Sequence, residues 1–287
     1  MTQSSPTSSA KSPSHSSPQT KSASYRLAVE DRDFMHRDEV RGVRLQLEYE
    51  KAEILLNEWG VRSTIIVFGS ARIPSPERAR AIRKAAGGQL EPKAEALLQK
   101  HLGYYQASRE FGRIASERGG AFAPVDRWRD NVIATGGGPG IMEAANRGAH
   151  EAGAPTIGFN INLPAEQFPN PYTTPELTFR FQYFGMRKMH MALRTNALVV
   201  FPGGFGTLDE LFELITLQQT GKTARSPIVL FDEAYWRKLV NFELLVEEGM
   251  IAATDLNLFA FAETAEQVWS ILVERGLRDH GPAHQHR

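Results

Sequence analysis

The chain has 287 residues, with 33 Lys and Arg against 33 Asp and Glu, and it contains no cysteine. Balanced charge argues against a nucleic-acid binder, because such proteins usually carry a basic excess or a basic stripe. The lack of cysteine excludes disulfides, thiol nucleophiles and cysteine-ligated metal centres, and it fits a reducing cytoplasm. No apolar run approaches the ~20 residues that a membrane-spanning helix needs, so we expect no membrane association.

Composition separates four segments along the chain. Residues 1–24 are mostly Ser, Pro, Thr and Lys. They carry too little apolar surface to offset the entropy of ordering, so we expect a disordered leader. The leader lacks the apolar core of a secretory signal. Residues 25–60 should form a helical extension, residues 61–278 one large α/β domain, and residues 279–287 a disordered tail.

Hydrophobic periodicity predicts strands that alternate with helices after a first helix at residues 37–59. Strands are expected at residues 64–68, 131–135, 156–160, 197–201 and 227–231. Helices are expected at residues 93–118, 141–152, 183–195, 207–219, 233–248 and 264–275, and the pattern assigns no structure to residues 74–92. Continuous apolar strands separated by helices predict an α/β fold, a Rossmann-like doubly wound parallel sheet with helices on both faces.

Glycine-rich turns follow three of the expected strands, and open parallel sheets bind ligands at this edge. Glycines let the backbone approach a ligand, and a helix start offers N–H groups to an anion. Neither a P-loop nor a complete dinucleotide fingerprint is present, so a monophosphate fits better than a triphosphate or NAD. The turns read Gly69-Ser70-Ala71-Arg72, Gly136-Gly137-Gly138-Pro139-Gly140-Ile141-Met142-Glu143 and Pro202-Gly203-Gly204-Phe205-Gly206-Thr207-Leu208-Asp209-Glu210.

The last of these turns also matches a capping box, with Thr207 as the N-cap and Glu210 reaching back from the third helical position. In that interpretation, Asp209 and Glu210 only complement the helix dipole. Capping does not require the glycines in front, however. Asp209 and Glu213 lie four residues apart on one helix face, beside any phosphate or ribose seated on the loop. Carboxylates at an anion site suggest chemistry on the sugar.

Cations open the helix that precedes the fourth expected strand. Arg187 and Lys188 are natural partners for a phosphate or a carboxylate, and the alternative is a solvated basic patch. His190 lies on the Met186, Met189 side of this helix, so we expect it to be packed rather than catalytic. No His, Asp and Glu cluster has metal-ligand spacing, so no metal site is expected.

Together these motifs, above all Pro-Gly-Gly-x-Gly-Thr-x-x-Glu with an upstream Arg-Lys, resemble the LOG ("Lonely Guy") family of cytokinin riboside 5′-monophosphate phosphoribohydrolases. Relatives of this family are often called putative lysine decarboxylases. The resemblance covers residues 63–275, and the long N-terminal part and the 74–92 segment look like the larger bacterial branch. It implies a nucleotide-binding catalytic domain that uses no cofactor. It also implies a homo-oligomer, with the site near the subunit interface.

The resemblance implies that Arg187 and Glu210 are the catalytic pair. It implies hydrolysis of the N-glycosidic bond of a nucleoside 5′-monophosphate, a cytokinin riboside monophosphate or AMP, to free base and ribose 5-phosphate. The substrate-binding residues expected at the three turns and on the basic helix are Gly69, Ser70, Gly137, Gly138, Met142, Glu143, Lys188, Gly203, Gly204, Phe205, Gly206, Thr207 and Asp209.

Two other functions stay open at this stage. One is a general purine or pyrimidine monophosphate nucleosidase that serves salvage. The other is a molybdenum-cofactor carrier, which the same fold resembles and which binds without catalysis. A lysine decarboxylase is disfavoured, because pyridoxal phosphate chemistry needs a Schiff-base lysine and Lys188 is better explained as a phosphate partner.

Overall fold

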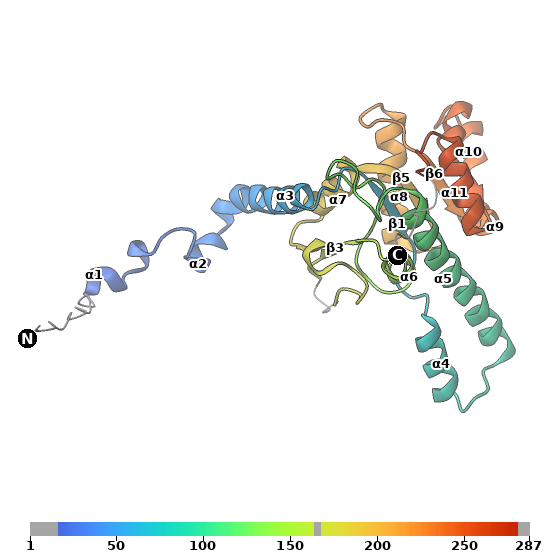
Figure 1. Ribbon diagram of the computed structural model, residues 1–287, viewed down its shortest axis with the longest axis horizontal. Helices are drawn as coiled ribbons and strands as arrows, with labels where there is room; N and C mark the ends of the chain where they lie inside the picture. Colours follow the sequence, from blue (N-terminus) through green and yellow to red (C-terminus); the bar gives the residue numbers. More distant parts are fainter. Residues whose placement is uncertain (1–16, 164–167, 281–287) are drawn as a thin grey trace, which may run out of the picture. The chain divides into compact units, whose positions relative to one another are not determined.

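The computed structural model describes residues 17–163 and 168–280, and the chain divides into two compact units, residues 1–47 and 48–287 (Figure 1). The first unit contains α1 (Pro18–Lys21), η1 (Ala23–Tyr25), α2 (Arg32–Met35), η2 (Asp38–Val40) and the start of α3 (Arg41–Glu58). Residues 1–16 of the predicted leader and residues 281–287 of the predicted tail lie outside the described residues. The boundary between the units falls within α3, whose later residues Ala52 and Leu56 are buried.

A seven-stranded sheet forms the centre of the second unit, with strand order β4-β3-β2-β1-β5-β6-β7 and parallel pairing throughout. The predicted doubly wound parallel α/β fold is therefore confirmed. The strands are β1 (Thr64–Phe68), β2 (Val132–Thr135), β3 (Ile157–Ile161), β4 (Thr178–Phe181), β5 (Thr195–Val200), β6 (Ile228–Phe231) and β7 (Phe259–Ala262). Side chains of β1 alternate between two apolar layers, with Ile66 and Phe68 in one and Ile65 and Val67 in the other.

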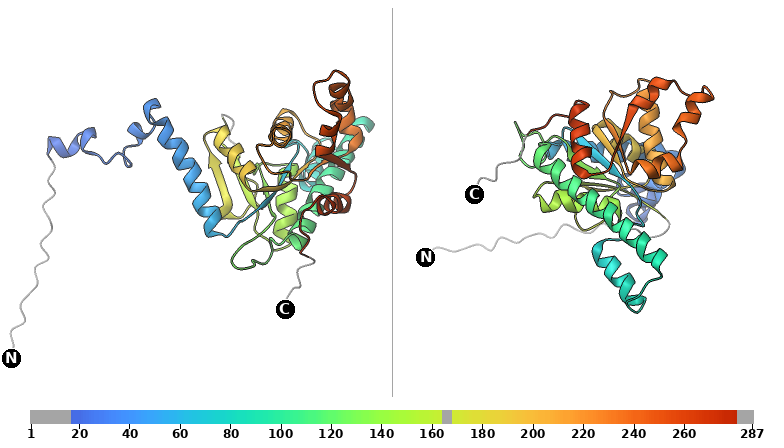
Figure 2. Two further views of the ribbon diagram at one scale, coloured as in Figure 1. Left: turned by 90° about the horizontal axis from the view of Figure 1, so that it is seen from above. Right: turned by 90° about the vertical axis from the view of Figure 1, so that its right-hand side faces the viewer.

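Helices cover both faces of this sheet, as Figures 1 and 2 show. The apolar layer on one face takes side chains from the later part of α3 and from α7 (Phe184–Leu193), α8 (Phe205–Gln219), α9 (Glu233–Leu239) and α10 (Phe242–Glu247). The layer on the other face takes them from α5 (Pro92–Arg118), α6 (Ile141–Glu151) and α11 (Ala265–Glu274). Within the described residues, no helix combines the length and apolarity needed to cross a membrane.

Among the described residues, several elements differ from the sequence prediction, and the following bear on the second unit. The unassigned segment 74–92 contains α4 (Pro76–Ala85), whose first turn is capped by Ser75. The helix expected at 233–248 is two helices, because the chain turns at Val240 and Asn241 then caps α10 through the N–H of Leu244. Strands β4 and β7 were not predicted. Both lie at sheet edges and neither is buried along its whole length, and β4 also carries the charged Arg180.

Candidate functional site

Backbone hydrogen bonds join the three glycine-rich turns at the carboxyl edge of the sheet. The N–H of Ser70 donates to the carbonyl of Pro202 at 3.0 Å, which links the turn after β1 to the turn after β5. The N–H of Ile141, at the start of α6, donates to the carbonyl of Ser70 at 3.2 Å. The strand order reverses between β1 and β5, so the turns meet at the switch point where open parallel sheets bind ligands.

Gly137 and Gly140 give the middle turn a backbone conformation that disfavours other residues. Their φ angles are 69° and 75°, in the left-handed region. A Cβ on Gly137 would lie 2.4 Å from Nδ2 of Asn160, and a Cβ on Gly140 would lie 2.3 Å from the carbonyl oxygen of Ser70. Sequence reasoning missed Asn160, a buried residue near the end of β3. Its position at a strand end was the only available signal.

We expect Gly137→Ala to destabilise the protein by about 1–3 kcal/mol, because alanine would be strained at this φ and would collide with Asn160. Gly206→Ala is the matched control for stability, because no atom lies within 4 Å of the added Cβ. Thermal unfolding of both variants measures the difference. Equal melting temperatures for wild type and Gly137→Ala would show that the turn tolerates a side chain.

The predicted capping box at the start of α8 is wrong. The helix begins at Phe205 with Gly204 as its N-cap, and no side chain among the described residues caps it. Thr207 is therefore the third helical residue, and its side chain is buried against Gly203. A Cβ on Gly203 would lie 2.1 Å from Oγ1 of Thr207, so only glycine fits there. Gly203 and Gly204 let the helix start two residues earlier than predicted. The first N–H groups of α8, which have no intrahelical acceptor, thus remain available to an anion.

Arg187 on α7 and Glu210 on α8 form a buried ion pair. Nη2 of Arg187 lies 2.6 Å from Oε1 of Glu210, and the two residues are 8% and 4% exposed. A Cβ on Gly136 would lie 3.4 Å from Nη1 of Arg187 and 3.0 Å from Sδ of Met142. The pair and Met142 therefore border the glycine turn. The Nε of Arg187 is buried without a partner among the described residues, so this guanidinium keeps a donor unused.

Burial raises the pKa of Glu210 to about 7, although Arg187 and Lys188 act in the opposite direction. Desolvation disfavours the charged carboxylate more than the neighbouring cations favour it. A carboxyl group with a pKa close to neutral pH can accept a proton during a reaction and return it afterwards, so Glu210 is suited to general base catalysis.

Lys188 and Asp209 form a second hydrogen-bonded cluster, which interacts with Glu210 through charge. Nζ of Lys188 lies 2.9 Å from both Asp209 Oδ2 and Glu213 Oε2. Burial alone would lower the pKa of Lys188, but its hydrogen bonds to these carboxylates outweigh burial and raise it. The cluster lines a surface cavity of about 620 Å³ together with Phe205 and other residues of α8. Successive residues on a helix point about 100° apart. Arg187 and Lys188 therefore pair with different partners, Glu210 and Asp209.

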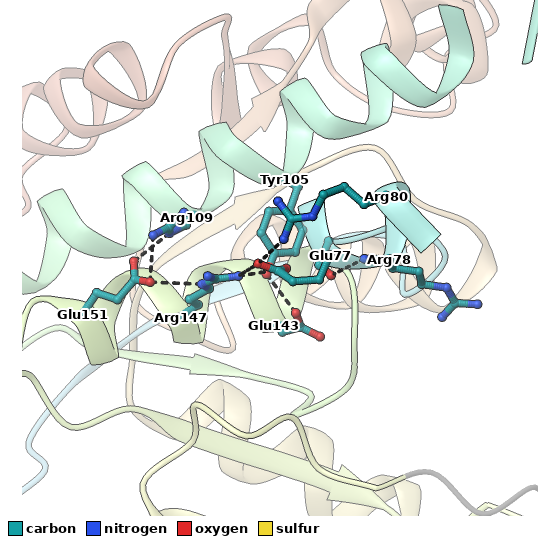
Figure 3. Close-up of polar contacts among 9 residues, drawn as sticks. Glu77, Arg78, Arg80, Tyr105, Arg109, Glu143, Arg147 and Glu151 are labelled. Carbon is teal, nitrogen blue, oxygen red and sulfur yellow. Dashed lines mark hydrogen bonds and ion pairs between the residues drawn. The ribbon is translucent and has the colours of Figure 1, made fainter. Parts of the chain in front are cut away.

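Glu143, expected to bind substrate, takes part in a polar network between α4, α5 and α6 (Figure 3). Its Oε1 accepts a hydrogen bond from the buried hydroxyl of Tyr105 at 2.8 Å. One turn further along α6, Arg147 lies 3.2 Å from Glu77 on α4 and 3.0 Å from Glu151. Burial raises the pKa of Tyr105, so its hydroxyl remains a donor. The structure thus directs Glu143 toward α5, and its part in ligand binding stays a prediction.

His190 is packed, as expected from its position on α7. Its side chain is fully buried and stacks on Tyr49 at a centroid distance of 5.2 Å. Burial lowers its pKa, and its Nδ1 lies 3.3 Å from Glu53 of α3. Within residues 17–163 and 168–280, no group of three or more His, Asp or Glu side chains could hold a metal ion.

A family model described as "Possible lysine decarboxylase" matches residues 142–272. The cytokinin riboside 5′-monophosphate phosphoribohydrolase LOG3 of Arabidopsis thaliana is 30% identical over 158 residues, which are 54% of this chain and 70% of the relative. A second relative from Arabidopsis thaliana, the probable cytokinin riboside 5′-monophosphate phosphoribohydrolase LOG6, is 31% identical over 145 residues. These residues are 50% of this chain and 72% of the relative.

A solved structure of a molybdenum cofactor binding protein from the phototrophic bacterium Rippkaea orientalis is 19% identical. It covers 75% of this chain and 98% of its own, with a TM-score of 0.44.

Fold and geometry together define a Rossmann-type α/β protein that has an uncapped helix start after β5 and a buried Arg–Glu pair at the glycine turns. By its similarity to these plant relatives, the chain belongs to the LOG family, as the motifs predicted.

Proposed function

We propose that this protein hydrolyses the N-glycosidic bond of a nucleoside 5′-monophosphate to free base and ribose 5-phosphate. The observation that carries this proposal is the buried Arg187–Glu210 pair beside the glycine turns and the uncapped start of α8. The names of the plant relatives, cytokinin riboside 5′-monophosphate phosphoribohydrolases, support it.

In the proposed complex, the 5′-phosphate lies at the first N–H groups of α8, on the Gly203–Thr207 loop. The helix dipole and these donors favour a dianion without any metal ion. Arg187 holds Glu210 through Nη2 while its Nη1 lies beside Gly136, where it would meet an oxygen of the ligand. Gly69, Ser70, Gly137 and Gly138 would close the other side of the pocket.

Cleavage proceeds through an oxocarbenium-like transition state, with positive charge on C1′ and the ring oxygen. The carboxylate of Glu210 stabilises this charge and takes a proton from the attacking water. The water oxygen forms a bond to C1′ as the bond to the base breaks, and the departing base nitrogen keeps the electron pair. The base takes a proton from solvent and Glu210 returns the proton it took from the attacking water to solvent, so the protons balance. Phosphate binding far from C1′ supplies positioning energy, so the riboside without phosphate reacts far more slowly.

The pH dependence of kcat/KM should show an acid limb with an apparent pKa of about 7, because Glu210 must be ionised to act as the base. Activity therefore falls as the pH drops below this value. A profile of base release against pH, with a nucleotide that does not titrate its base in this range, measures the limb. A flat profile down to about pH 5, where an ordinary Glu is still ionised, would contradict the role of Glu210.

The rates of base release from AMP and from isopentenyladenosine monophosphate, measured in one assay, distinguish a salvage nucleosidase from an enzyme that activates a cytokinin. Preference for the isopentenyl nucleotide indicates an apolar subsite for the N6 substituent, and preference for AMP indicates salvage. Tight nucleotide binding with no base release would instead favour a carrier, and a copurifying pterin would identify it as a molybdenum-cofactor carrier.

We further propose that the protein forms a homo-oligomer through the outer face of α8. Phe205 is 93% exposed, and with Leu208, Phe212 and Leu217 it lines the 620 Å³ surface cavity that also contains Lys188. An apolar surface of this kind beside a polar site is typical of a protein interface. Light scattering of the purified chain measures the mass, and a monomeric Phe205→Asp variant would support this surface.

A further inference from the structure

Tyr235 on α9 contacts the proposed phosphate loop from outside the sequence-predicted site. Its hydroxyl donates to the carbonyl of Gly203 at 2.7 Å. Gly203 lies one residue before the N-cap of α8, in the turn that leads into the helix start. No motif pointed to Tyr235, because it lies about thirty residues further along the chain.

A separate network fixes Tyr235. Asp232 has a left-handed φ of 69° and caps α9 by accepting the N–H of Tyr235 at 2.9 Å. Its other carboxylate oxygen accepts the hydroxyl of Tyr104 and lies 3.2 Å from Nζ of Lys100, both on α5. The ring of Tyr235 also packs edge-on against Trp236, with centroids 5.4 Å apart. The hydroxyl thus reaches Gly203 from a rigid support.

The contact has a directional consequence for the loop. The peptide bonds of the described residues are trans, so the Gly203 carbonyl and the Gly204 N–H point in opposite directions across their shared peptide plane. Tyr235 holds the carbonyl on the side of α9, which follows β6. The Gly204 N–H therefore points away from that side. In the strand order, β2, which carries the middle glycine turn, lies on the opposite side of β5 from β6. Ser70 of the turn after β1 lines one cavity with Gly203 and Tyr235.

We propose that Tyr235 is a positioning residue for the phosphate-binding loop. By holding the Gly203 carbonyl outward, it keeps a carbonyl dipole from facing the phosphate and turns the Gly204 N–H toward it. A loop that lacked this hydrogen bond would sample the flipped peptide, which places an acceptor where the anion needs a donor. The inference rests on the proposed function only in taking a nucleotide phosphate as the ligand.

Tyr235→Phe removes the hydroxyl alone. The ring keeps its packing against Trp236, and removing one atom creates no collision. Tyr235 lines a cavity of about 230 Å³ together with Ser70 and Tyr104. We expect the Kd for AMP and for inorganic phosphate to rise about five-fold, which corresponds to the net free energy of about one hydrogen bond. The Kd for adenosine should stay the same. For turnover, KM should rise more than kcat falls.

Isothermal titration of wild type, Tyr235→Phe and a control variant with AMP, inorganic phosphate and adenosine tests the inference. Tyr172→Phe is the control, because this tyrosine lies between β3 and β4 beside His150 and Arg147. Thermal unfolding shows that each variant is folded.

Unchanged AMP affinity in Tyr235→Phe, or equal losses for AMP and adenosine, would overturn the positioning role, as would a wild type that does not bind AMP. If wild type binds AMP but releases no base, the proposed function fails. The comparison of affinities then still tests Tyr235.

Discussion

Glu210→Gln should lower kcat for base release by about a thousand-fold while the affinity for AMP stays within a few-fold of wild type. The amide keeps the shape of the side chain and can still accept a hydrogen bond from Arg187. It cannot carry the negative charge that stabilises an oxocarbenium ion, and it cannot take a proton from water. Binding depends mainly on the phosphate loop, which this substitution leaves intact.

Glu213→Gln is the matched control for Glu210. It lies one turn further along α8, is half-buried and pairs with Lys188 instead of Arg187. Its kcat should stay within about five-fold of wild type, because it makes no hydrogen bond to the buried pair and acts on Glu210 only through its charge. Single-turnover kinetics with AMP separates the chemical step from binding. Near-wild-type turnover by Glu210→Gln would leave Glu210 with a structural role only.

Arg187→Ala should lower both activity and stability. It leaves Glu210 buried without its cation, and breaking a buried pair typically costs about 3–5 kcal/mol. We expect kcat/KM to fall by about a hundred-fold or more, because both the position of Glu210 and a cation at the glycine turn are lost. Arg180→Ala, on the exposed edge of β4, is the control and should change stability by less than about 0.5 kcal/mol.

The loss of stability in Arg187→Ala should depend on pH. The pKa of Glu210 in the folded wild type is about 7, above the 4.5 of an unperturbed Glu. The contribution of Glu210 to the free energy of unfolding is therefore present at acid pH. It is lost as the pH rises through the pKa of the folded state. Without Arg187 the folded pKa rises further. The deficit of the variant should therefore be larger at about pH 8 than at about pH 6, where Glu210 is neutral in both proteins. Denaturant unfolding at both pH values measures this, and a deficit independent of pH would contradict the coupling.

The strand pattern predicted the fold because its central strands are short, apolar and buried on both faces. The two strands it missed, β4 and β7, lie at the edges of the sheet, and Arg180 of β4 interrupts the apolar run of that strand. The order of strands could not be read from the pattern. That order brings Ser70 to Pro202, a contact between residues far apart in sequence.

The sequence singled out candidate site residues but not their arrangement. Glycine motifs and family resemblance identified Arg187 and Glu210, and the structure brings these two together. Capping rules placed the start of α8 two residues late. They take the Thr207 hydroxyl as the cap and do not consider that Gly204 can serve as the N-cap without a side chain. The proximity of Asn160 to Gly137 and of Tyr235 to Gly203 could not be predicted, because these neighbours come together across the sheet edge and not through local sequence.

Quantifying free base and ribose 5-phosphate together, after incubation of the wild-type chain with AMP and separately with adenosine, tests the central claim most directly. The proposed mechanism predicts equimolar base and ribose 5-phosphate from AMP, and release from adenosine slower by about a hundred-fold or more, since the phosphate supplies the positioning energy. Recovery of intact AMP from a protein that binds it would contradict the claim.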